Sequence, residues 1–263
     1  MAEFTSLYSG SAGNCSVIRC GSRYLLVDMG KSCRTTLAGL KALDLALSDC
    51  DGILVTHEHS DHVKGLTVFL KKYAVPVYGA ADTLDMLLQN GILPPDCCVN
   101  ALGTGHTEDV GAFGVEMFPT SHDVPCVGYR VQTPDGRRMA IATDLGTLTP
   151  AVHAALSGCD LVALESNYDL HMLRTGPYPY YLRARIESPR GHLSNDECSA
   201  KILELVQEGC KKFALCHLSQ ENNTPVQALM SVRNTLGAAG VIPGADCVVQ
   251  AQRRSEVSPV LTF

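Results

Sequence analysis

The chain of 263 residues lacks the long apolar run that a membrane-spanning helix needs, since no stretch approaches ~18 uninterrupted apolar residues. Its start, "MAEFTSLYSGSAGN", has neither the basic beginning nor the apolar centre of a signal peptide. No C-x-x-C pair occurs, although 12 cysteines are scattered through apolar runs. These absences predict a cytoplasmic protein without membrane contact, whose cysteines are reduced and buried.

Positive charge is also scarce, because 21 Lys and Arg residues face 27 Asp and Glu residues and the formal net charge is −6. This balance argues against a protein that coats nucleic acid through bulk charge, and it leaves room for a local basic patch. No internal repeat, low-complexity tract or linker interrupts the chain. Hydrophobic residues make up 46% of it, so we expect one domain, residues 1–263, with a sizeable core.

Short apolar runs alternate with helical patterns along the whole chain, which is typical of an α/β protein. We expect strands at residues 15–20, 23–30, 52–56, 76–80, 98–102, 114–120, 127–133, 138–144, 159–166, 211–218 and 246–252. We expect helices at residues 35–47, from residue 65 onward, and at residues 83–90, 150–156, 195–208 and 225–236, with an irregular stretch at residues 167–191. Ser194 with Glu197 predicts a capping box, and Gly209 a helix stop.

The densest group of reactive side chains is "THEHSDH", residues 56–62, directly after the apolar run "GILV". The helical zinc-protease motif H-E-x-x-H is excluded, because Asp61 stands where its second histidine would be. Three further apolar runs end in a possible metal ligand, at His122, Asp144 and His217. If these strands share a direction, their ends meet at one sheet edge, where ligands of open sheets bind.

Together these residues resemble the H-x-H-x-D-H signature and the accompanying motifs of the metallo-β-lactamase fold, a four-layered αββα sandwich. The five motifs fall in order at Asp28, His57 to His62, His122, Asp144 and His217. The resemblance implies one divalent metal ion on His57, His59 and His122. It implies a second ion on Asp61, His62 and His217, with Asp144 bridging the two. Imidazole and carboxylate ligands suit zinc, manganese or iron.

Such a pair of cations, about 3.5–4 Å apart, lowers the pKa of a bound water from about 15.7 toward ~7. We expect the resulting bridging hydroxide to be the nucleophile, with Asp61 orienting it. Asp28 is then a partner that holds the loop and a ligating histidine from behind. No cysteine stands at the second metal position, unlike in the antibiotic-hydrolysing branches, and the site favours phosphate esters.

Three further stretches resemble the bacterial WalJ/YycJ group of this superfamily, which is associated with 5′-to-3′ exonuclease action on DNA. They are "YSGSAGNC", "RGHLSNDE" and "CHLSQENN". The resemblance implies that His192 contacts phosphate or protonates the leaving group. Further candidates for DNA contact lie in phosphate-binding turns, at a helix start and among the tyrosines of residues 167–191. These candidates are Ser9, Ser11, Asn14, Arg183, Arg185, Arg190, Ser194 and Asn195.

Two other functions stay open at this point. The same site would serve a small-molecule hydrolase acting on a lactone, a thioester or a cyclic phosphodiester, and a closed apolar pocket would indicate it. A metal-dependent sensor that binds DNA without cutting it is the other. Some residues also have purely structural interpretations: Asp28 as a turn residue, His192 as part of a helix cap, and the tyrosines as packing for a long loop.

Overall fold

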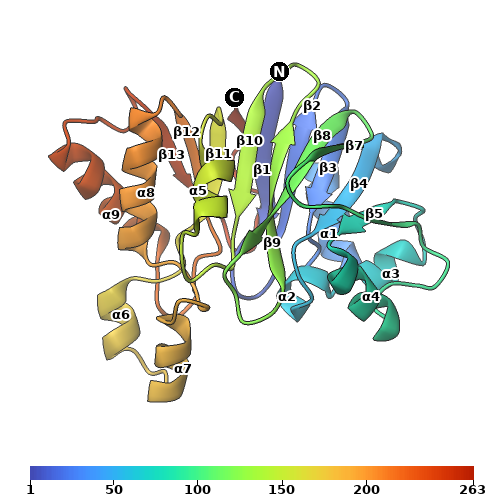
Figure 1. The fold of residues 1–263 in the computed structure, drawn as a ribbon, viewed down its shortest axis with the longest axis horizontal. Coiled ribbons are helices and arrows are strands. Elements are labelled where there is room, and N and C mark those ends of the chain that lie inside the picture. The colour runs from blue at the N-terminus through green and yellow to red at the C-terminus, as the bar shows by residue number, and fades with distance from the viewer. The chain divides into compact units, whose positions relative to one another are not determined.

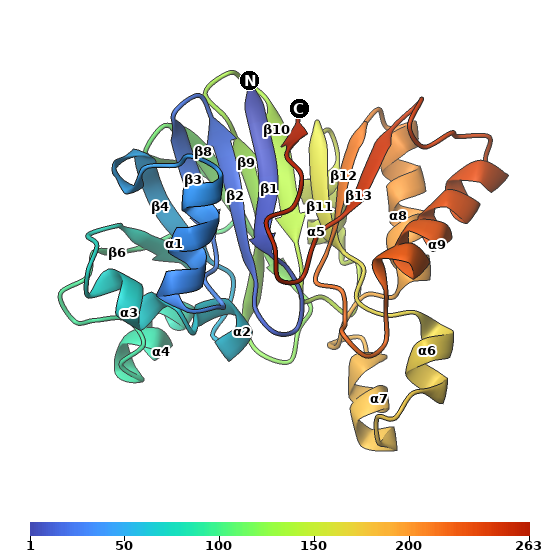
Figure 2. The same ribbon diagram turned by 180° about the vertical axis from the view of Figure 1, so that it is seen from behind.

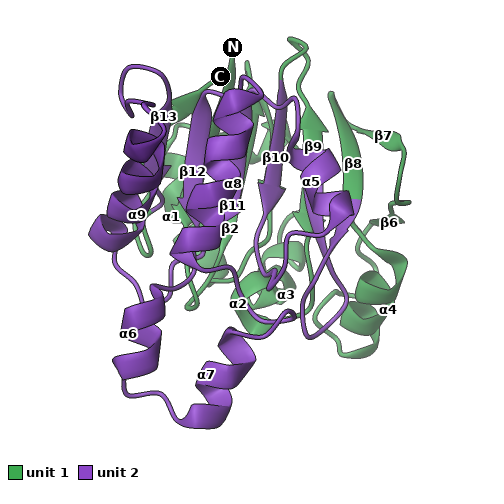
Figure 3. Cartoon of the chain, turned by 60° about the vertical axis from the view of Figure 1, so that its left-hand side comes forward, with its two compact units in different colours: residues 1–117, 131–137, 253–263 green, residues 118–130, 138–252 purple.

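The computed structural model describes all residues, 1–263, and the chain divides into two compact units. Unit 1 comprises residues 1–117, 131–137 and 253–263, and unit 2 comprises residues 118–130 and 138–252. Figure 3 distinguishes the two by colour. Each unit is assembled from separated stretches of sequence, so no single boundary in the chain marks it. The single domain expected from the sequence stays a prediction.

The first seven-stranded sheet lies in unit 1 and has the order β14-β1-β2-β3-β4-β5-β6 (Figures 1 and 2). Its strands are β1 (Ala2–Tyr8), β2 (Cys15–Cys20), β3 (Arg23–Val27), β4 (Cys50–Val55), β5 (Val77–Gly79), β6 (Val99–Ala101) and β14 (Leu261–Thr262). Strands β14, β1, β2 and β3 pair antiparallel, whereas β3, β4, β5 and β6 pair parallel. The sequence missed β1 and β14.

Four α-helices belong to this sheet's unit: α1 (Cys33–Ala42), α2 (Ser60–Val63), α3 (Leu66–Leu70) and α4 (Ala81–Gln89), with a 3₁₀ turn η1 (Leu47–Asp49). Their apolar residues join those of β2, β3 and β4 in one buried core. Helix α1 is shorter than the expected 35–47. It stops because Asp44 adopts the left-handed conformation, with φ of 52°, and the N–H of Leu45 bonds back to Leu40.

The second sheet has the order β13-β12-β11-β10-β9-β8-β7. Its strands are β7 (Thr107–Val110), β8 (Phe113–Thr120), β9 (Cys126–Gln132), β10 (Arg138–Ala142), β11 (Leu161–Glu165), β12 (Lys212–Cys216) and β13 (Val248–Ala251). Strands β10 to β13 are parallel and in register, with Ala142 beside Leu164 and Glu165 beside Cys216. Their carboxyl ends therefore lie along one edge, as expected for the strands that precede Asp144 and His217. The strand that precedes His57, β4, lies in the first sheet instead, so the expectation of a single sheet edge for all these residues is wrong.

Helices α5 (Pro150–Leu156), α8 (Asn195–Gln207) and α9 (Pro225–Ala238) pack on β10 to β12 through a second buried core. Alternate residues of β11 and β12 enter this core, as a pleated strand requires. The expected start of α8 is confirmed: Ser194 and Glu197 form both bonds of a capping box. Gly209 follows that helix with φ of 103°, which confirms its expected stop.

Residues 167–191 contain two short helices, α6 (Leu170–Thr175) and α7 (Tyr180–Ile186), where an irregular stretch is expected from the sequence. The side chain of Asp169 caps α6 by accepting from the N–H of Met172. Leu173 and Ile186 pack with Tyr168 in a small core of their own. Helices this short carry too few residues for a visible apolar period, which is why the sequence pattern did not reveal them.

No helix combines the length and the apolar character that crossing a membrane requires. All twelve cysteines are free thiols, and ten of them are buried, the exceptions being Cys97 and Cys98.

The backbone of Asp61 lies so close to Gly30 that a substitution there tests the fold. A Cβ atom on Gly30 would lie 1.6 Å from the backbone oxygen of Asp61, where no atom fits. We expect Gly30→Ala to lower the free energy of unfolding by about 3 kcal/mol, measured by urea denaturation. Gly237→Ala is the control: it lies on exposed helix α9 with open space around it, and should stabilise by about 0.5–1 kcal/mol. Equal effects of the two changes would contradict the packing argument.

Candidate metal centre

The first ligand group consists of His57, His59, Asp61 and His62, in the loop and short helix that follow β4. Strand β4 is buried along its whole length, and it ends at Val55, so the chain leaves the sheet just before these residues. The ring centroids of His57 and His59 are 4.6 Å apart, and those of His57 and His62 are 4.1 Å apart. The loop therefore brings the imidazoles of His59 and His62 close to that of His57.

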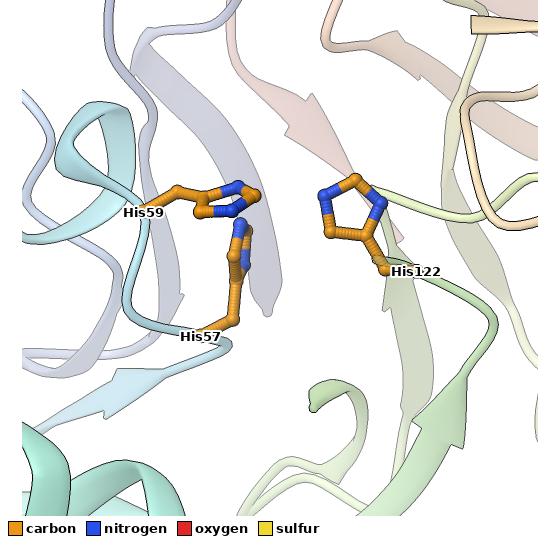
Figure 4. A group of neighbouring side chains, drawn as sticks. All are labelled: His57, His59 and His122. Carbon is orange, nitrogen blue, oxygen red and sulfur yellow. The ribbon is translucent and has the colours of Figure 1, made fainter. Parts of the chain in front are cut away.

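Figure 4 draws the imidazoles of His57 and His59, which extend from the loop after β4, together with the imidazole of His122, which follows β8. His57 is fully buried. Its Nδ1 lies 3.0 Å from the hydroxyl oxygen of Thr56. Asp61 stands beside His62, with 3.5 Å between Oδ2 and Nε2.

Asp28 holds this loop from the end of the neighbouring parallel strand, β3. Its carboxylate accepts from the backbone N–H of Thr56 at 2.9 Å and from the hydroxyl of Thr56 at 2.8 Å. It also accepts from Nδ1 of His62 at 2.7 Å. When Nδ1 carries the proton, Nε2 keeps its lone pair, and this is the tautomer that binds a metal. The geometry suits the role that the sequence predicts for Asp28.

The second ligand group lies in unit 2 and consists of His122, Asp144, Glu165, His192 and His217. Oδ1 of Asp144 lies 3.6 Å from Nε2 of His217, 3.9 Å from Nδ1 of His192 and 4.0 Å from Nε2 of His122. Three imidazoles thus surround one carboxylate oxygen. A cation would suit Nε2 of His122, Nε2 of His217 and the carboxylate of Asp144, because it can accept the lone pairs of these ring nitrogens and the charge of the carboxylate.

Glu165, at the end of β11, is the organising residue of this group, and the sequence reasoning did not assign it a role. Its Oε1 accepts from Nδ1 of His192 at 2.9 Å and from Nδ1 of His217 at 2.8 Å. Its Oε2 accepts from the backbone N–H groups of Leu145 and Leu193. A signal did exist: the run "LVALE" ends in an acid, like the apolar runs that end at Asp144 and His217.

The charge state of Glu165 follows from its surroundings. Its side chain is 0% exposed, and burial alone would raise the pKa of its carboxyl. The imidazoles of His192 and His217 outweigh burial and hold this pKa below its ordinary value. For His122, burial dominates and lowers the pKa of the imidazole, so the ring is held neutral. A neutral ring is the metal-binding form.

The residues present therefore fit divalent metal ions by their donor chemistry. His62 and His217 each direct Nδ1 at a buried carboxylate, and His122 directs Nδ1 at the carbonyl oxygen of Gly191, 3.2 Å away. Carboxylate–histidine and carbonyl–histidine pairs of this kind accompany metal-ligating histidines in proteins. The assignment of each ligand to a first or second ion stays a prediction.

Backbone strain is concentrated at the same residues. Four residues other than glycine have a positive φ, and three of them are Asp28 at 62°, Asp144 at 58° and His217 at 54°. Each one stands one or two residues beyond the end of a parallel strand. Left-handed backbone at such positions turns the side chain out of the strand direction, and it persists only where surrounding contacts enforce it.

Several expected DNA contacts are instead engaged within the protein. Asn195 is 2% exposed, and its side chain bonds to Ser166 and Asn223. Ser194 serves as the cap of α8. The side chain of Asn14 accepts from the N–H of Gly10, and its Nδ2 lies 3.1 Å from Nε2 of His62.

The remaining polar candidates differ in exposure. Ser9 is buried, and its N–H donates to the carbonyl oxygen of Arg253. Ser11 is exposed. For all of these residues the substrate role stays a prediction.

The arginines of residues 167–191 are also bound within unit 2. Arg185 forms an ion pair with Asp123. Arg190 donates to the backbone oxygens of His122 and Asp123 at 2.8 and 3.1 Å. Arg183 donates to the backbone oxygen of a residue in α6. These guanidinium groups brace the segment that carries α6 and α7, and their contact with a DNA strand stays a prediction.

Glu165 provides a test of this geometry. Glu165→Gln keeps the shape of the side chain but turns an amide N–H₂ toward groups that are themselves donors. We expect it to lower the free energy of unfolding of the metal-free protein by about 2–4 kcal/mol in urea denaturation. Glu208→Gln, on the exposed end of α8, is the matched control and should change it by less than about 0.5 kcal/mol. An unaffected Glu165→Gln protein would show that the carboxylate does not organise the group.

Comparison with known proteins bears directly on this site. The model of the beta-lactamase superfamily domain matches residues 23–217. The exodeoxyribonuclease YycJ of Bacillus anthracis is 36% identical over 241 residues, 90% of each chain. The exodeoxyribonuclease WalJ of Streptococcus pneumoniae strain D39 is 30% identical over 260 residues, 98% of this chain and 97% of that protein. A ribonuclease Z of Bradyrhizobium diazoefficiens is 28% identical over 47% of this chain and 45% of its own.

Among solved structures, the metallo-β-lactamase fold protein YhfI from Bacillus subtilis superposes with a TM-score of 0.73 over 98% of both chains, at 17% identity. This likeness confirms the fold class expected from the five motifs. The match of the family model covers most of the chain, and the two exodeoxyribonucleases match nearly all of it. The chain therefore belongs to the beta-lactamase superfamily, within the WalJ/YycJ-type group of proteins that have the metallo-β-lactamase fold.

Proposed function

We propose that this protein is a two-metal phosphodiesterase that degrades DNA from the 5′ end. The observation that carries the proposal is that histidines of both ligand groups are held through Nδ1 by buried acceptors, which favours the tautomer that binds a metal through Nε2. This donor set suits divalent cations and hydrolysis. The two relatives that match nearly the whole chain are named exodeoxyribonucleases, which supports DNA as the substrate.

The metal ions would be held as the motifs imply. One would take His57, His59 and His122, the other would take Asp61, His62 and His217, and Asp144 would bridge them. When bound, two such cations offset phosphate charge and lower the pKa of a water that attacks phosphorus.

The chain's own residues then act as orienting groups. Asp61 aligns the attacking water, and the Asp28 carboxylate keeps His62 in its metal-binding tautomer.

His192 is placed to serve the leaving group. Its Nδ1 is held 2.9 Å from Glu165, and the ring is only partly buried, so Nε2 is the atom available to substrate. The buried carboxylate behind the ring orients it, as in acid–base catalysis by other carboxylate–histidine pairs. Hydrolysis from the 5′ end breaks the bond between phosphorus and the 3′ oxygen of the first nucleotide. His192 donates its Nε2 proton to that oxygen.

Metal content gives the first test of the function. Mass spectrometry of the purified protein, reconstituted and desalted, should find about two divalent ions per chain. His57→Ala and His217→Ala should each reduce this to about one, because each change removes a ligand of a different ion. His106→Ala, an exposed histidine that pairs with Glu108, should leave it unchanged. One ion in the unmodified protein would contradict the two-metal proposal.

Polarity of degradation gives the second test. Metal-loaded protein should release 5′ nucleotides from end-labelled double-stranded DNA. Asp61→Ala and His192→Ala should slow this by about 10²–10⁴-fold, as loss of an orienting or proton-transfer group does. His171→Ala, an exposed residue of α6, is the control and should match the unmodified protein.

Three other outcomes would redirect the proposal. Preference for an RNA strand of the same sequence would make the substrate RNA. Cleavage of bis-(p-nitrophenyl) phosphate with DNA left intact would indicate a small-molecule phosphodiesterase. DNA binding without turnover in the metal-loaded protein would indicate a sensor.

A further inference from the structure

A groove in unit 1 lies between α1 and the segment formed by α2 and α3. Its volume is about 530 Å³. We call it the basic groove, and its lining residues are Ser32, Cys33, Arg34, Leu37, Lys64, Gly65, Val68 and Lys72. Helices α1 and α3 run close together in both ribbon views, and residues of the two helices are in contact (Figures 1 and 2).

The charge of this groove is of one sign. Arg34, Lys64 and Lys72 line it, and no acidic residue does, although acids outnumber bases in the chain as a whole. All three side chains are exposed, and none of them takes part in an ion pair. The groove thus concentrates three uncompensated cations, which is the feature that polyanions recognise.

The spacing of the lining residues sets the shape of one wall. Lys64, Val68 and Lys72 recur every four residues along the α2–α3 segment, and all three line the groove. Val68 stands between the two lysines and is 51% exposed, an unusual exposure for a large apolar side chain. Leu37 on α1 adds a second apolar contact. A ligand with alternating charged and apolar parts, such as a nucleic acid strand with phosphates and bases, fits this wall.

The groove is built onto the first ligand group. Lys64 is the second residue after His62, and its N–H bonds to the carbonyl oxygen of Ser60 in the same helical turn. Gly65 packs so tightly against the backbone of Lys31 that a Cβ would lie 2.1 Å from its oxygen. The segment that begins with the histidines of the loop therefore continues without a break into the wall of the basic groove.

We propose that the basic groove binds the phosphate backbone of the DNA substrate next to the first ligand group. This inference rests on the proposed function, and it assigns strand binding to α1 and α3 rather than to the arginines near α6 and α7. The basic residues of the groove differ from the arginines near α6 and α7 in their ion pairs. Arg174 is paired with Glu187 and Arg185 with Asp123, whereas Arg34, Lys64 and Lys72 are available to phosphate.

The test compares two triple variants that remove the same charge. Arg34→Gln, Lys64→Gln and Lys72→Gln together make the groove variant. Arg138→Gln, Lys211→Gln and Arg233→Gln make the control, at exposed positions of unit 2. The affinity of metal-loaded protein for a phosphorothioate-linked oligonucleotide, which resists hydrolysis, is measured by fluorescence anisotropy at several salt concentrations. Melting temperature and metal content verify that both variants fold.

We expect the groove variant to bind at least 10-fold more weakly than the unmodified protein at 0.15 M salt. The slope of log K against log salt should fall by about 2–3, because each lost phosphate contact removes ~0.7–0.9. The control should keep the original slope. Equal affinities and slopes for the two variants would overturn the assignment. It would also be overturned if the groove variant kept the DNA affinity of the unmodified protein but lost binding to anionic phosphatidylglycerol vesicles.

The same proteins separate this inference from the proposed function. If the unmodified protein binds the oligonucleotide through the groove but leaves ordinary DNA uncut, the groove binds DNA and the proposed nuclease activity is wrong. If the unmodified protein cuts DNA and the groove variant has the same KM for DNA, the proposed nuclease activity holds and the groove does not bind the substrate.

Discussion

A buried carboxylate that holds the Nδ1 atom of a histidine is the constraint on which both ligand groups depend. Asp28 imposes it on His62, and Glu165 imposes it on His192 and His217. A buried carboxylate is stable only when donors surround it, and the backbone N–H groups at the strand ends help supply them, at Thr56 for Asp28. The chemistry of the imidazoles thus depends on where two strands end.

Parallel strands place these carboxylates, and strained backbone completes the arrangement. Strands β3 and β4 end side by side in unit 1, as β10, β11 and β12 do in unit 2. Asp28, Asp144 and His217 take left-handed backbone there, at a cost of about 1–3 kcal/mol each. Hydrogen bonds such as that from Asn167 to the carbonyl oxygen of His217 offset this strain. Stability elsewhere in the core maintains a geometry that the local sequence does not favour.

The distribution of ion pairs sorts the basic residues into two kinds. Arginines near α6 and α7 are engaged by Asp123, by Glu187 and by backbone oxygens, so they stiffen that segment. Arg34, Lys64 and Lys72, which line the basic groove, have no such partners. In an acidic protein, cations without acidic neighbours exert the strongest local field on a polyanion. The amino-acid composition does not separate paired from unpaired basic residues, because only their neighbours in the folded protein distinguish them.

The sequence by itself determined the fold class, most strands and long helices, and the motif residues, because apolar periodicity and the spacing of "HEHSDH" are local properties of the chain. It missed β1, β7, β14, α6 and α7, which are short or depend on distant partners. It also left Glu165 without a role, and it did not show that the arginines near α6 and α7 are engaged by Asp123, Glu187 and backbone oxygens. Only the tertiary structure decided these points, because hydrogen bonds and ion pairs join residues far apart in the chain, such as Glu165 and His217.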